Sequence, residues 1–303
     1  VYIGGGTPTE LPAAAWRRLA GALAAHLAPE FEWTVEANPV SVTPEKADIL
    51  RFAGVNRVSL GVQSAADPVL ARLGRLHRHR DALAALQCLR RAGFDNISFD
   101  LIFGLADDRL DETLDFFLAE QPAHISAYEL VVEGQSAWKL AGFDPSEPDE
   151  RKLEKMGHVI ARLENAGYRR YEISNFARPG RECRHNLNTW RCGEFEAFGA
   201  GACGCSPAGR YRHVPDAAAW LAGAAPENEP IANLAADTVL LALRLVDGLP
   251  IAELSPPRQA ALRAHAATVA ALVKRGLLVD RPDHLQATPR GLLFLNDIIM
   301  EFL

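Results

Sequence analysis

Three polar side chains stand near the ends of successive predicted strands, and their chemistry suits the binding of a polar ligand. Glu36 lies in one of these strands, Gln63 in the next and Asp100 in a third. Side chains alternate along a strand, so each of the three can point toward the mouth of a common interior. Because a buried carboxylate is costly unless it is paired or hydrogen-bonded, two carboxylates and an amide favour a ligand rich in hydroxyl and ammonium groups.

A glycine loop at the start of the chain adds a second element to this candidate site. The run V-Y-I-G-G-G-T-P leads from apolar residues into three glycines, Thr7 and Pro8. Glycine has no Cβ, so backbone N–H groups can close around a ligand, and a strand-to-helix turn of this kind suits a charged cofactor. Taken singly, Glu36 could cap a turn and Asp100 could form a salt bridge. Together with the loop, we interpret them as one site.

The first residue, Val1, already lies inside a predicted strand. We therefore expect an N-terminally incomplete sequence that lacks roughly one strand–helix unit.

Strands and helices alternate through the first half of the chain. This pattern predicts an α/β fold, a parallel sheet with helices outside it. The choice is between a βα barrel and an open doubly wound sheet, and no G-x-G-x-x-G fingerprint supports the dinucleotide-binding version. The predicted strands are 1–3, 31–37, 57–63, 96–103, 124–132 and 168–174, and the helices are 12–26, 44–52, 67–73, 81–92, 109–120 and 148–166.

The second half of the chain changes character. Residues 177–214 read as a loop rich in Gly, Arg and Cys. The C-terminal part predicts helices, a β-hairpin turning near 282–283, and a last helix, which together form a winged-helix pattern. From Asp237 to the end there are seven acidic and seven basic residues, so we disfavour DNA binding and favour a packing or lid role. The predicted domains are 1–176, 177–232 and 233–303.

Composition excludes several classes of protein. The net charge of −6 argues against a broad nucleic-acid surface. No stretch approaches 18 uninterrupted apolar residues, so no transmembrane segment is predicted. Five cysteines without regular spacing are not a disulfide framework, and they favour a reduced, cytoplasmic setting.

Eight short motifs in order carry a family resemblance. I-G-G-G-T-P, E-A-N-P, G-V-Q-S, R-L-G-R-L-H and D-L-I-F-G-L resemble the oxygen-independent coproporphyrinogen III oxidase-like group of radical S-adenosylmethionine (SAM) proteins. Y-E-I-S-N-F-A-R-P-G, R-H-N-L-N-T-W-R and G-A-G-A resemble its heme chaperone branch (HemW-type) more than the true oxidase. The resemblance implies a partial βα (TIM-like) radical SAM barrel with a C-terminal helical, winged-helix-like domain.

The resemblance also implies roles for the candidate site residues, although it assigns no catalytic residue. Arg75 would bind the SAM carboxylate, because a guanidinium forks onto a carboxylate, and Asp100 would accept from the ribose hydroxyls. Arg75 also lies in a basic run, so a solvated face remains the alternative. The full implied SAM set is Gly5, Gly6 and Thr7 at the amino-acid end, with Glu36, Gln63, Arg75 and Asp100.

The family's [4Fe–4S] cluster has no ligands in this sequence. Three cysteines in a CxxxCxxC motif hold the cluster in the family, and that spacing does not occur here. The family's motif lies upstream of the glycine loop, so we expect it before Val1 and assign no metal ligand within the chain. A rival metal hypothesis is weak because its spacing matches no standard zinc or cluster site. Its residues are Cys183, His185, Cys192, Cys203 and Cys205.

A heme site is implied by the family's H-N-x-x-Y-W stretch. It corresponds here to His185, Asn186 and Trp190, which could offer an imidazole to iron and a flat apolar face to the macrocycle. Thr189 replaces the usual Tyr and Cys203 a usual His, and both departures weaken the assignment. A histidine bonded to backbone in a loop is the alternative for His185.

The resemblance implies a heme chaperone that passes heme to a hemoprotein acceptor, of the respiratory chain or another. One alternative is a coproporphyrinogen III oxidase that works through a 5′-deoxyadenosyl radical. A second is a barrel binding module that has lost its cluster. Whether the protein is an enzyme stays open at this point.

Overall fold

The computed structural model describes residues 1–132 and 137–303, and these divide into two compact units. The first unit comprises Val1–Arg170 and Ser174–Glu182, and the second comprises Tyr171–Ile173 and Cys183–Leu303. The predicted domain boundaries at 176/177 and 232/233 stay a prediction.

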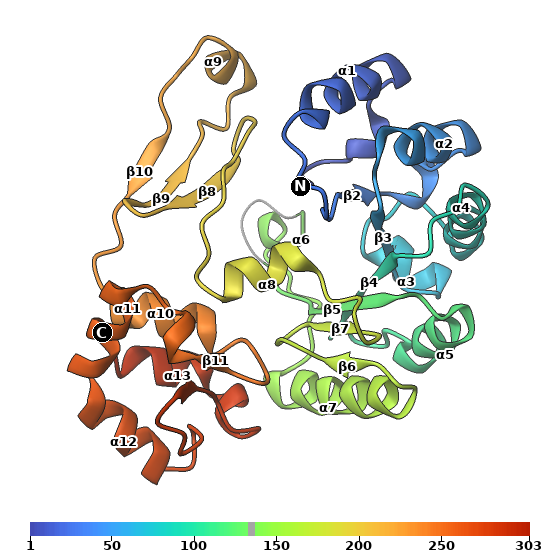
Figure 1. Ribbon diagram of the computed structural model, residues 1–303. Helices are drawn as coiled ribbons and strands as arrows, with labels where there is room; N and C mark the ends of the chain where they lie inside the picture. Colours follow the sequence, from blue (N-terminus) through green and yellow to red (C-terminus); the bar gives the residue numbers. More distant parts are fainter. Residues whose placement is uncertain (133–136) are drawn as a thin grey trace. The chain divides into compact units, whose positions relative to one another are not determined.

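A seven-stranded sheet forms the centre of the first unit (Figure 1). Strands β1 to β5 lie in chain order and run parallel, as the alternation of strands and helices predicts. β7 then pairs antiparallel with β5, and β6 antiparallel with β7. The strands are β1 (Tyr2–Ile3), β2 (Thr34–Ala37), β3 (Arg57–Gln63), β4 (Ile97–Phe103), β5 (His124–Glu129), β6 (Arg169–Arg170) and β7 (Asn175–Ala177).

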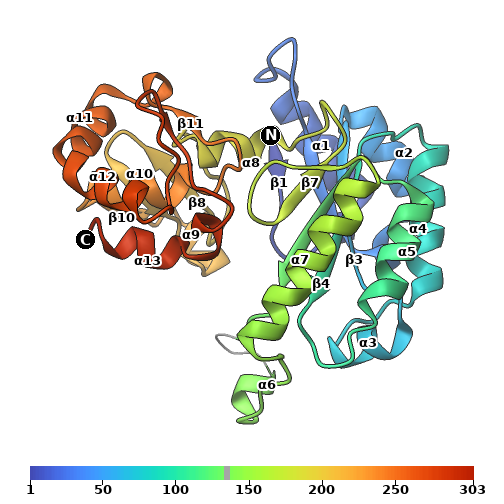
Figure 2. The same cartoon turned by 90° about the horizontal axis from the view of Figure 1, so that it is seen from below.

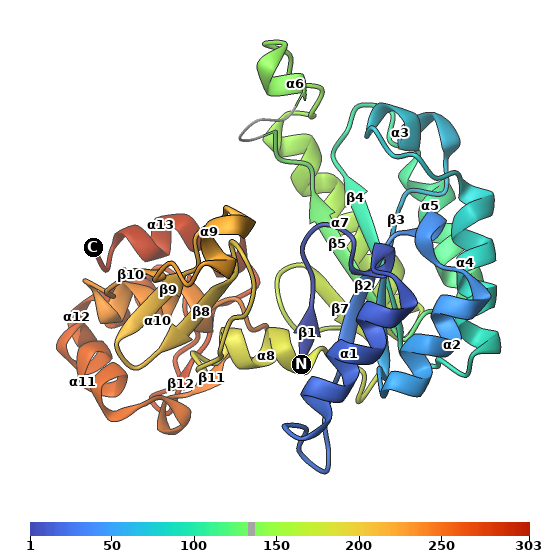
Figure 3. The ribbon, with the colours of Figure 1, turned by 90° about the horizontal axis from the view of Figure 1, so that it is seen from above.

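Helices cover the outer face of this sheet. Figure 2 shows α2, α4 and α5 along one side of the strands, where alternate apolar residues such as Val58, Leu60 and Phe99 are fully buried. Figure 3 shows α3 and α6 beyond one end of the sheet. The helices are α1 (Ala13–Ala24), α2 (Pro44–Ala53), α3 (Asp67–Arg72), α4 (His79–Arg91), α5 (Leu110–Glu120), α6 (Ala137–Leu140) and α7 (Asp149–Asn165), with 3₁₀ turns η1 (Pro8–Glu10) and η2 (Pro39–Ser41).

The other face of the same strands is polar although it is also buried. The register pairs Thr34 with Arg57, and it aligns Ser59 with Ser98 and Ser98 with His124. All five are buried. Such a polar inner face is what a βα barrel that binds a ligand requires, since its interior carries every second side chain of each strand.

The strand predicted over 168–174 is wrong. Two short strands, β6 and β7, stand there, and residues 171–173 between them belong to the second unit. Val246 N–H donates to the Tyr171 carbonyl at 3.1 Å, and Glu172 forms an antiparallel bridge with Leu245. The backbone groups of 171–173 are thus satisfied outside the sheet, which splits the strand.

The region 177–214, predicted as a loop, contains regular structure. It holds one helix and two strands. These two strands form a small antiparallel sheet with a third strand further along the chain. Gly, Cys, Arg and Glu dominate these strands, so the pattern of β-branched and aromatic residues that marks a strand is missing. The elements are α8 (Arg184–Trp190), β8 (Cys203–Ser206), β9 (Gly209–Arg212), α9 (Ala217–Leu221) and β10 (Glu227–Glu229).

The C-terminal part of the second unit is helical around its own apolar core. The predicted hairpin is confirmed, since Leu278 bridges Ala287 and Val279 N–H donates to the Gln286 carbonyl at 2.9 Å. Within the described ranges no helix has both the length and the apolar character needed to cross a membrane. The elements are α10 (Leu234–Ala242), β11 (Leu249–Pro250), η3 (Ile251–Glu253), α11 (Pro256–Ala264), α12 (Ala266–Lys274), β12 (His284–Leu285), η4 (Gly291–Leu293) and α13 (Leu295–Met300).

Candidate functional site

The glycine loop and Glu36 meet at the carboxyl ends of β1 and β2. The Tyr2 hydroxyl donates to Glu36 Oε1 at 2.7 Å, and the Gly5 N–H donates to Oε2 at 3.2 Å. A Cβ at Gly4 would lie 2.8 Å from Glu36 Cδ, so only glycine allows the carboxyl group to sit there. Gly5 and Gly6 have φ values of 83° and 57°, which glycine adopts without steric cost. The loop is therefore shaped around an acidic side chain.

The far end of the glycine loop is anchored by the following elements. The Thr9 hydroxyl bonds that of Ser41 in η2, and Lys46 of α2 donates to the Thr9 carbonyl. The Thr7 carbonyl accepts from Glu10 N–H at 2.9 Å, which starts η1 directly after the glycines. These bonds hold the loop from one side and leave its glycine segment exposed.

Asp100 lies on the polar inner face, two residues along β4 from Ser98. Its carboxylate accepts from the Ser59 hydroxyl at 3.0 Å and from the Ser126 hydroxyl. Burial raises the pKa of Asp100 to about 6, and the charge of Glu36 adds to this, while Ser59 and the Arg57 guanidinium act in the opposite direction. In the described part of the chain neither Glu36 nor Asp100 forms an ion pair. Both acids therefore keep capacity for a ligand.

Gln63 is the last residue of β3, and Arg75 lies in the loop after α3. Gln63 is buried, and a Cβ at Gly61 would lie 3.0 Å from its Nε2, so Gly61 makes room for the amide. Arg75 has a buried Nε that no hydrogen-bond partner satisfies. A guanidinium nitrogen in that condition fits the recognition of an anionic group better than a solvated face does.

The structure thus brings Gly5 and Glu36 into direct contact and puts Asp100 within reach of the Glu36 charge. Thr7 and Arg75 lie in loops and Gln63 ends β3, and among the described residues no hydrogen bond or ion pair joins these three side chains to Gly5 or Glu36. The assignment of these residues to SAM stays a prediction.

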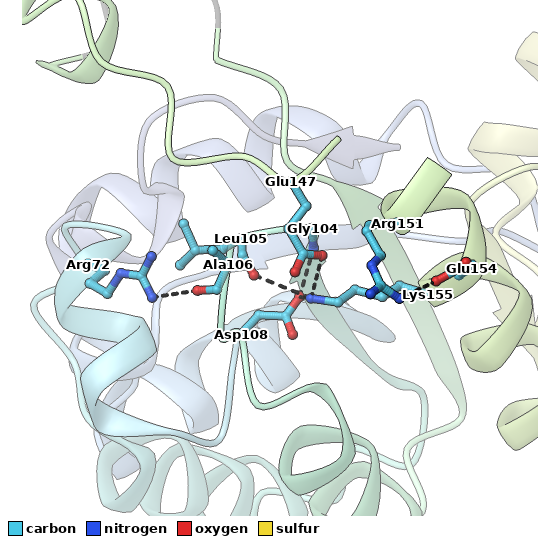
Figure 4. A network of polar contacts seen from close by, with 9 residues as sticks. All are labelled: Arg72, Gly104, Leu105, Ala106, Asp108, Glu147, Arg151, Glu154 and Lys155. Carbon is cyan, nitrogen blue, oxygen red and sulfur yellow. Dashed lines mark hydrogen bonds and ion pairs between the residues drawn. The ribbon is translucent and has the colours of Figure 1, made fainter. Parts of the chain in front are cut away.

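A polar network holds the loop that follows Asp100 in the chain (Figure 4). Asp108, whose side chain is 4% exposed, accepts from Gly104 N–H at 2.8 Å and pairs with Lys155 Nζ of α7 at 2.7 Å. Lys155 also pairs with Glu147 at 2.8 Å. The buried ion pair fixes the carboxyl end of β4, so the site is built on a rigid support.

Sequence reasoning missed several inward polar groups around the site. Tyr2, Arg57 and Ser126 contact or charge-stabilise the two carboxylates, and burial beside Glu36 raises the pKa of Tyr2. Alternation along β3 could have found Arg57, because counting back in twos from Gln63 leads to it. Tyr2 and Ser126 lie in strands where no inward position was assigned, so the same signal does not reach them.

The residues implied for heme all lie in α8 of the second unit. The His185 ring contacts Phe195 edge-on at 5.7 Å between centroids. The Trp190 ring lies under the Arg244 guanidinium at 4.4 Å and packs against the C-terminal core. Five helical residues correspond to a rotation of about 140° between the two side chains. His185 and Trp190 therefore point to different sides of α8, and Asn186 shares the side of Trp190.

The cysteines do not gather into a metal centre. Among the described residues no three or more His, Cys, Asp or Glu side chains are placed to hold a metal ion, and no disulfide forms. Burial raises the pKa of the Cys192 thiol to about 11, which disfavours a metal-binding thiolate. These residues do not fit a [4Fe–4S] cluster, so no step is assigned to one here.

Comparison with known proteins identifies two segments. The Radical SAM superfamily model matches residues 1–117, and the HemN C-terminal domain model matches residues 232–294. The radical SAM family implies SAM and a [4Fe–4S] cluster as cofactors.

Full-length similarities agree with these segments. The heme chaperone HemW of Mycobacterium tuberculosis (strain H37Rv) is 39% identical over 319 residues, covering all of this chain and 80% of that protein. The heme chaperone HemW of Escherichia coli K12 is 32% identical, covering all of this chain and 83% of that protein. The radical SAM enzyme coproporphyrinogen III oxidase (HemN) of Escherichia coli superposes with a TM-score of 0.81 at 22% identity, covering 99% of this chain and 76% of that one.

The structural likeness confirms the predicted fold class, a parallel α/β radical SAM fold with a helical C-terminal part. The family resemblance noted in the sequence is confirmed by these relatives, which match along the whole of this chain. The chain belongs to the heme chaperone HemW family of the radical SAM superfamily.

Proposed function

We propose that this protein binds heme and transfers it to a hemoprotein acceptor, with SAM as a bound cofactor. The observation that carries the proposal is the similarity to proteins named heme chaperone HemW along the whole of the chain. Five cysteines without a disulfide suit work in the reducing cytoplasm. The acceptor is a hemoprotein, of the respiratory chain or another, and nucleic acid is not a partner.

The residues of the first unit fit the amino-acid end of SAM. Gly5 and Gly6 form an exposed turn that continues into the half-buried Thr7, and the Glu36 carboxylate beside Gly5 complements an ammonium group. The unsatisfied Nε of Arg75 supports a role in binding the cofactor carboxylate. When bound, SAM would supply a sulfonium-linked adenosyl group.

We assign the ribose hydroxyls of SAM to Asp100. A diol donates two hydrogen bonds, and an ionised carboxylate accepts both, so Asp100 must be deprotonated to do this. Its pKa of about 6 means that the group is ionised at neutral pH. Gln63 completes the set from β3 as a neutral donor and acceptor.

A heme titration tests whether the protein binds heme. Addition of heme to the protein is expected to give a shifted Soret band, and His185→Ala is expected to lose it, because an imidazole is a strong axial ligand. His26→Ala, which removes an exposed histidine of the first unit, is the matched control and keeps the shift. Trp190→Leu is expected to have a smaller effect, since Arg244 already covers that ring.

The outcomes separate the parts of the proposal. No Soret shift in the unmutated protein contradicts heme binding itself. An equal shift in the unmutated protein and in His185→Ala contradicts only the choice of ligand. Movement of heme from the loaded protein to an apo-hemoprotein, followed by the acceptor's own absorption, tests the transfer.

A second candidate is oxidative decarboxylation of coproporphyrinogen, favoured by the HemN C-terminal domain match. Anaerobic assay of the cluster-reconstituted protein discriminates, because only an oxidase forms vinyl product. A binding module without a cluster is the third candidate, and a CxxxCxxC motif encoded before Val1 would remove it.

A further inference from the structure

The last residue of β3 has an unusual backbone. The register between β3 and β4 shifts between Leu60 and Gln63, and Gln63 has a φ of 64°. Ser64 N–H donates to the Val62 carbonyl at 2.8 Å, across Gln63. A bond from residue i+2 to residue i around a positive φ is a γ-turn of the rare, strained kind. Such a conformation persists only when its surroundings hold it.

A buried histidine holds this turn. His77 is 1% exposed, and its Nε2 lies 3.0 Å from the same Val62 carbonyl oxygen. A carbonyl only accepts, so Nε2 carries the proton and donates. The Nδ1 atom is buried without a hydrogen-bond partner, which makes it the unprotonated nitrogen of a neutral ring. The Val62 carbonyl thus accepts two bonds, one within the turn and one from outside it.

The residues after the turn are held separately. Thr113 Oγ1 of α5 accepts from Ala65 N–H at 3.0 Å and lies 3.1 Å from Ser64 Oγ. These bonds fix the path of the chain after Gln63. In the described part of the molecule, His77 supplies the only side-chain hydrogen bond to the carbonyl that precedes Gln63.

The same histidine links Gln63 to Arg75. His77 is two residues from Arg75 in the loop after α3, and the nearby Arg75 charge contributes to lowering the pKa of His77, after burial as the main cause. Arg75 carries the buried Nε that has no partner. One hydrogen bond therefore ties the loop of Arg75 to the turn of Gln63.

We propose that His77 is a positioning residue that holds Gln63 and Arg75 together as one side of the ligand site. The proposal rests on the proposed function, because the ligand is SAM. His77 itself does not touch the ligand. It acts by donating to the Val62 carbonyl, which fixes the direction of the Gln63 side chain and the distance from it to Arg75.

Two variants of His77 test this. His77→Phe keeps a ring and removes the donor, and His77→Gln keeps an N–H that can reach the position of Nε2. S-adenosylhomocysteine is the probe, and its affinity for the full chain is measured by calorimetry. We expect His77→Phe to weaken binding about tenfold and His77→Gln to restore most of it. His26→Phe is the control at an exposed histidine.

A double-mutant cycle separates positioning from general damage. If His77 acts through Gln63, His77→Phe has little further effect in a Gln63→Ala background. It keeps its full effect in an Asp100→Asn background, because Asp100 lies on another strand. Equal effects of His77→Phe in both backgrounds, or affinity unchanged by His77→Phe, would overturn the proposal.

Amide hydrogen exchange gives a readout that needs no ligand. Without the His77 bond, exchange is expected to rise in residues 60–66 and 73–78 and to stay unchanged in residues 97–103. Unchanged exchange in 60–66 overturns the inference about His77 even if ligand binds. Absence of S-adenosylhomocysteine binding in the unmutated protein contradicts the proposed function instead, and the exchange result then judges the His77 turn by itself.

Discussion

Two carboxylates, Asp100 in the first unit and Asp237 in the second, are held in opposite ways. In the second unit Asp237 forms ion pairs with Arg210 and with Arg258, the latter at 2.8 Å. In the first unit Asp100 accepts from the hydroxyls of Ser59 and Ser126 and forms no ion pair among the described residues. One acid is neutralised by the fold, while the other is held by neutral donors.

This difference separates a structural acid from a candidate binding acid. A buried carboxylate flanked by two guanidinium groups has its charge compensated and offers little to a ligand. A carboxylate with only hydroxyl donors keeps a raised pKa and an incompletely compensated charge, a pattern that gathers at functional sites. Replacing each of the two acids in turn, and measuring stability and ligand affinity, tests this comparison.

The largest expected effect is on stability, at Asp237. Asp237→Ala leaves the buried Arg258 and the half-buried Arg210 without their shared partner, so unfolding of the second unit is expected to become easier by about 3–5 kcal/mol. Chemical denaturation followed by tryptophan fluorescence measures this. The comparison fails if Asp237→Ala is as stable as the unmutated protein.

The matched change in the first unit should leave stability intact and weaken ligand binding. Asp100→Asn removes an acid whose charge is disfavoured by burial, so the free energy of unfolding at neutral pH is expected to stay equal or rise. Affinity for S-adenosylhomocysteine should fall by roughly 10- to 100-fold, the size of a charged hydrogen bond. Calorimetry measures the affinity, and a large loss of stability with intact binding would reverse the roles of the two acids.

The pH dependence of binding sharpens the assignment of Asp100. Ribose hydroxyls need the ionised acceptor, so affinity is expected to fall as the pH drops through about 6, by up to about tenfold per pH unit below it. In Asp100→Asn this step is expected to disappear. A step that persists in the variant would assign the titration to another group.

The raised pKa of Asp100 also determines how the stability of the folded protein changes with pH. The folded-state pKa of Asp100, about 6, lies above the ordinary 3.8, so the folded protein binds more protons between these values and loses stability as the pH rises from about 4 to 6. His77 and His124 act oppositely: burial lowers both pKa values, so their contribution is complete above pH 6.5 and is lost as the pH falls. Denaturation curves of Asp100→Asn across pH 4–7 isolate the first contribution.

The smallest expected effect comes from an exposed pair beside a buried one. Figure 4 shows Arg151 and Glu154, paired at 2.8 Å with side chains 69% and 64% exposed, next to Lys155 and the buried Asp108. Glu154→Ala is expected to change the free energy of unfolding by no more than about 0.5 kcal/mol, because water screens the pair. Lys155→Met, which leaves Asp108 buried without its cation, is the contrasting variant. Equal effects of the two would show that burial does not decide the strength of these pairs.

Much of the first unit follows from local pattern. The predicted strand over 57–63 has the bounds of β3, and the predicted helix over 44–52 ends one residue before α2 does. Glu36 and Asp100 do share the inner, polar face, as alternation along their strands predicts. Apolar residues of the outer face and polar residues of the inner face alternate every two positions, so the pattern can be recognised without knowing which strands are neighbours.

The strands of the second unit could not be predicted from local pattern in this way. Its strands β8, β9 and β10 are short and polar, and the residues 171–173 leave the sheet because their partners lie about 70 residues later in the chain. The pairs of Asp237 join a helix to a strand and to a second helix. Patterns within a segment carry no information about such partners.

The sequence by itself determined the parallel α/β order, the family signature and which residue types face the interior, because these depend on local periodicity and on short motifs. The tertiary structure decided the rest. It gave Asp100 neutral donors and Asp237 two arginines, and it brought His77 to the turn of Gln63. These contacts join segments distant in the chain, and the packing and register of whole elements determine which of them meet.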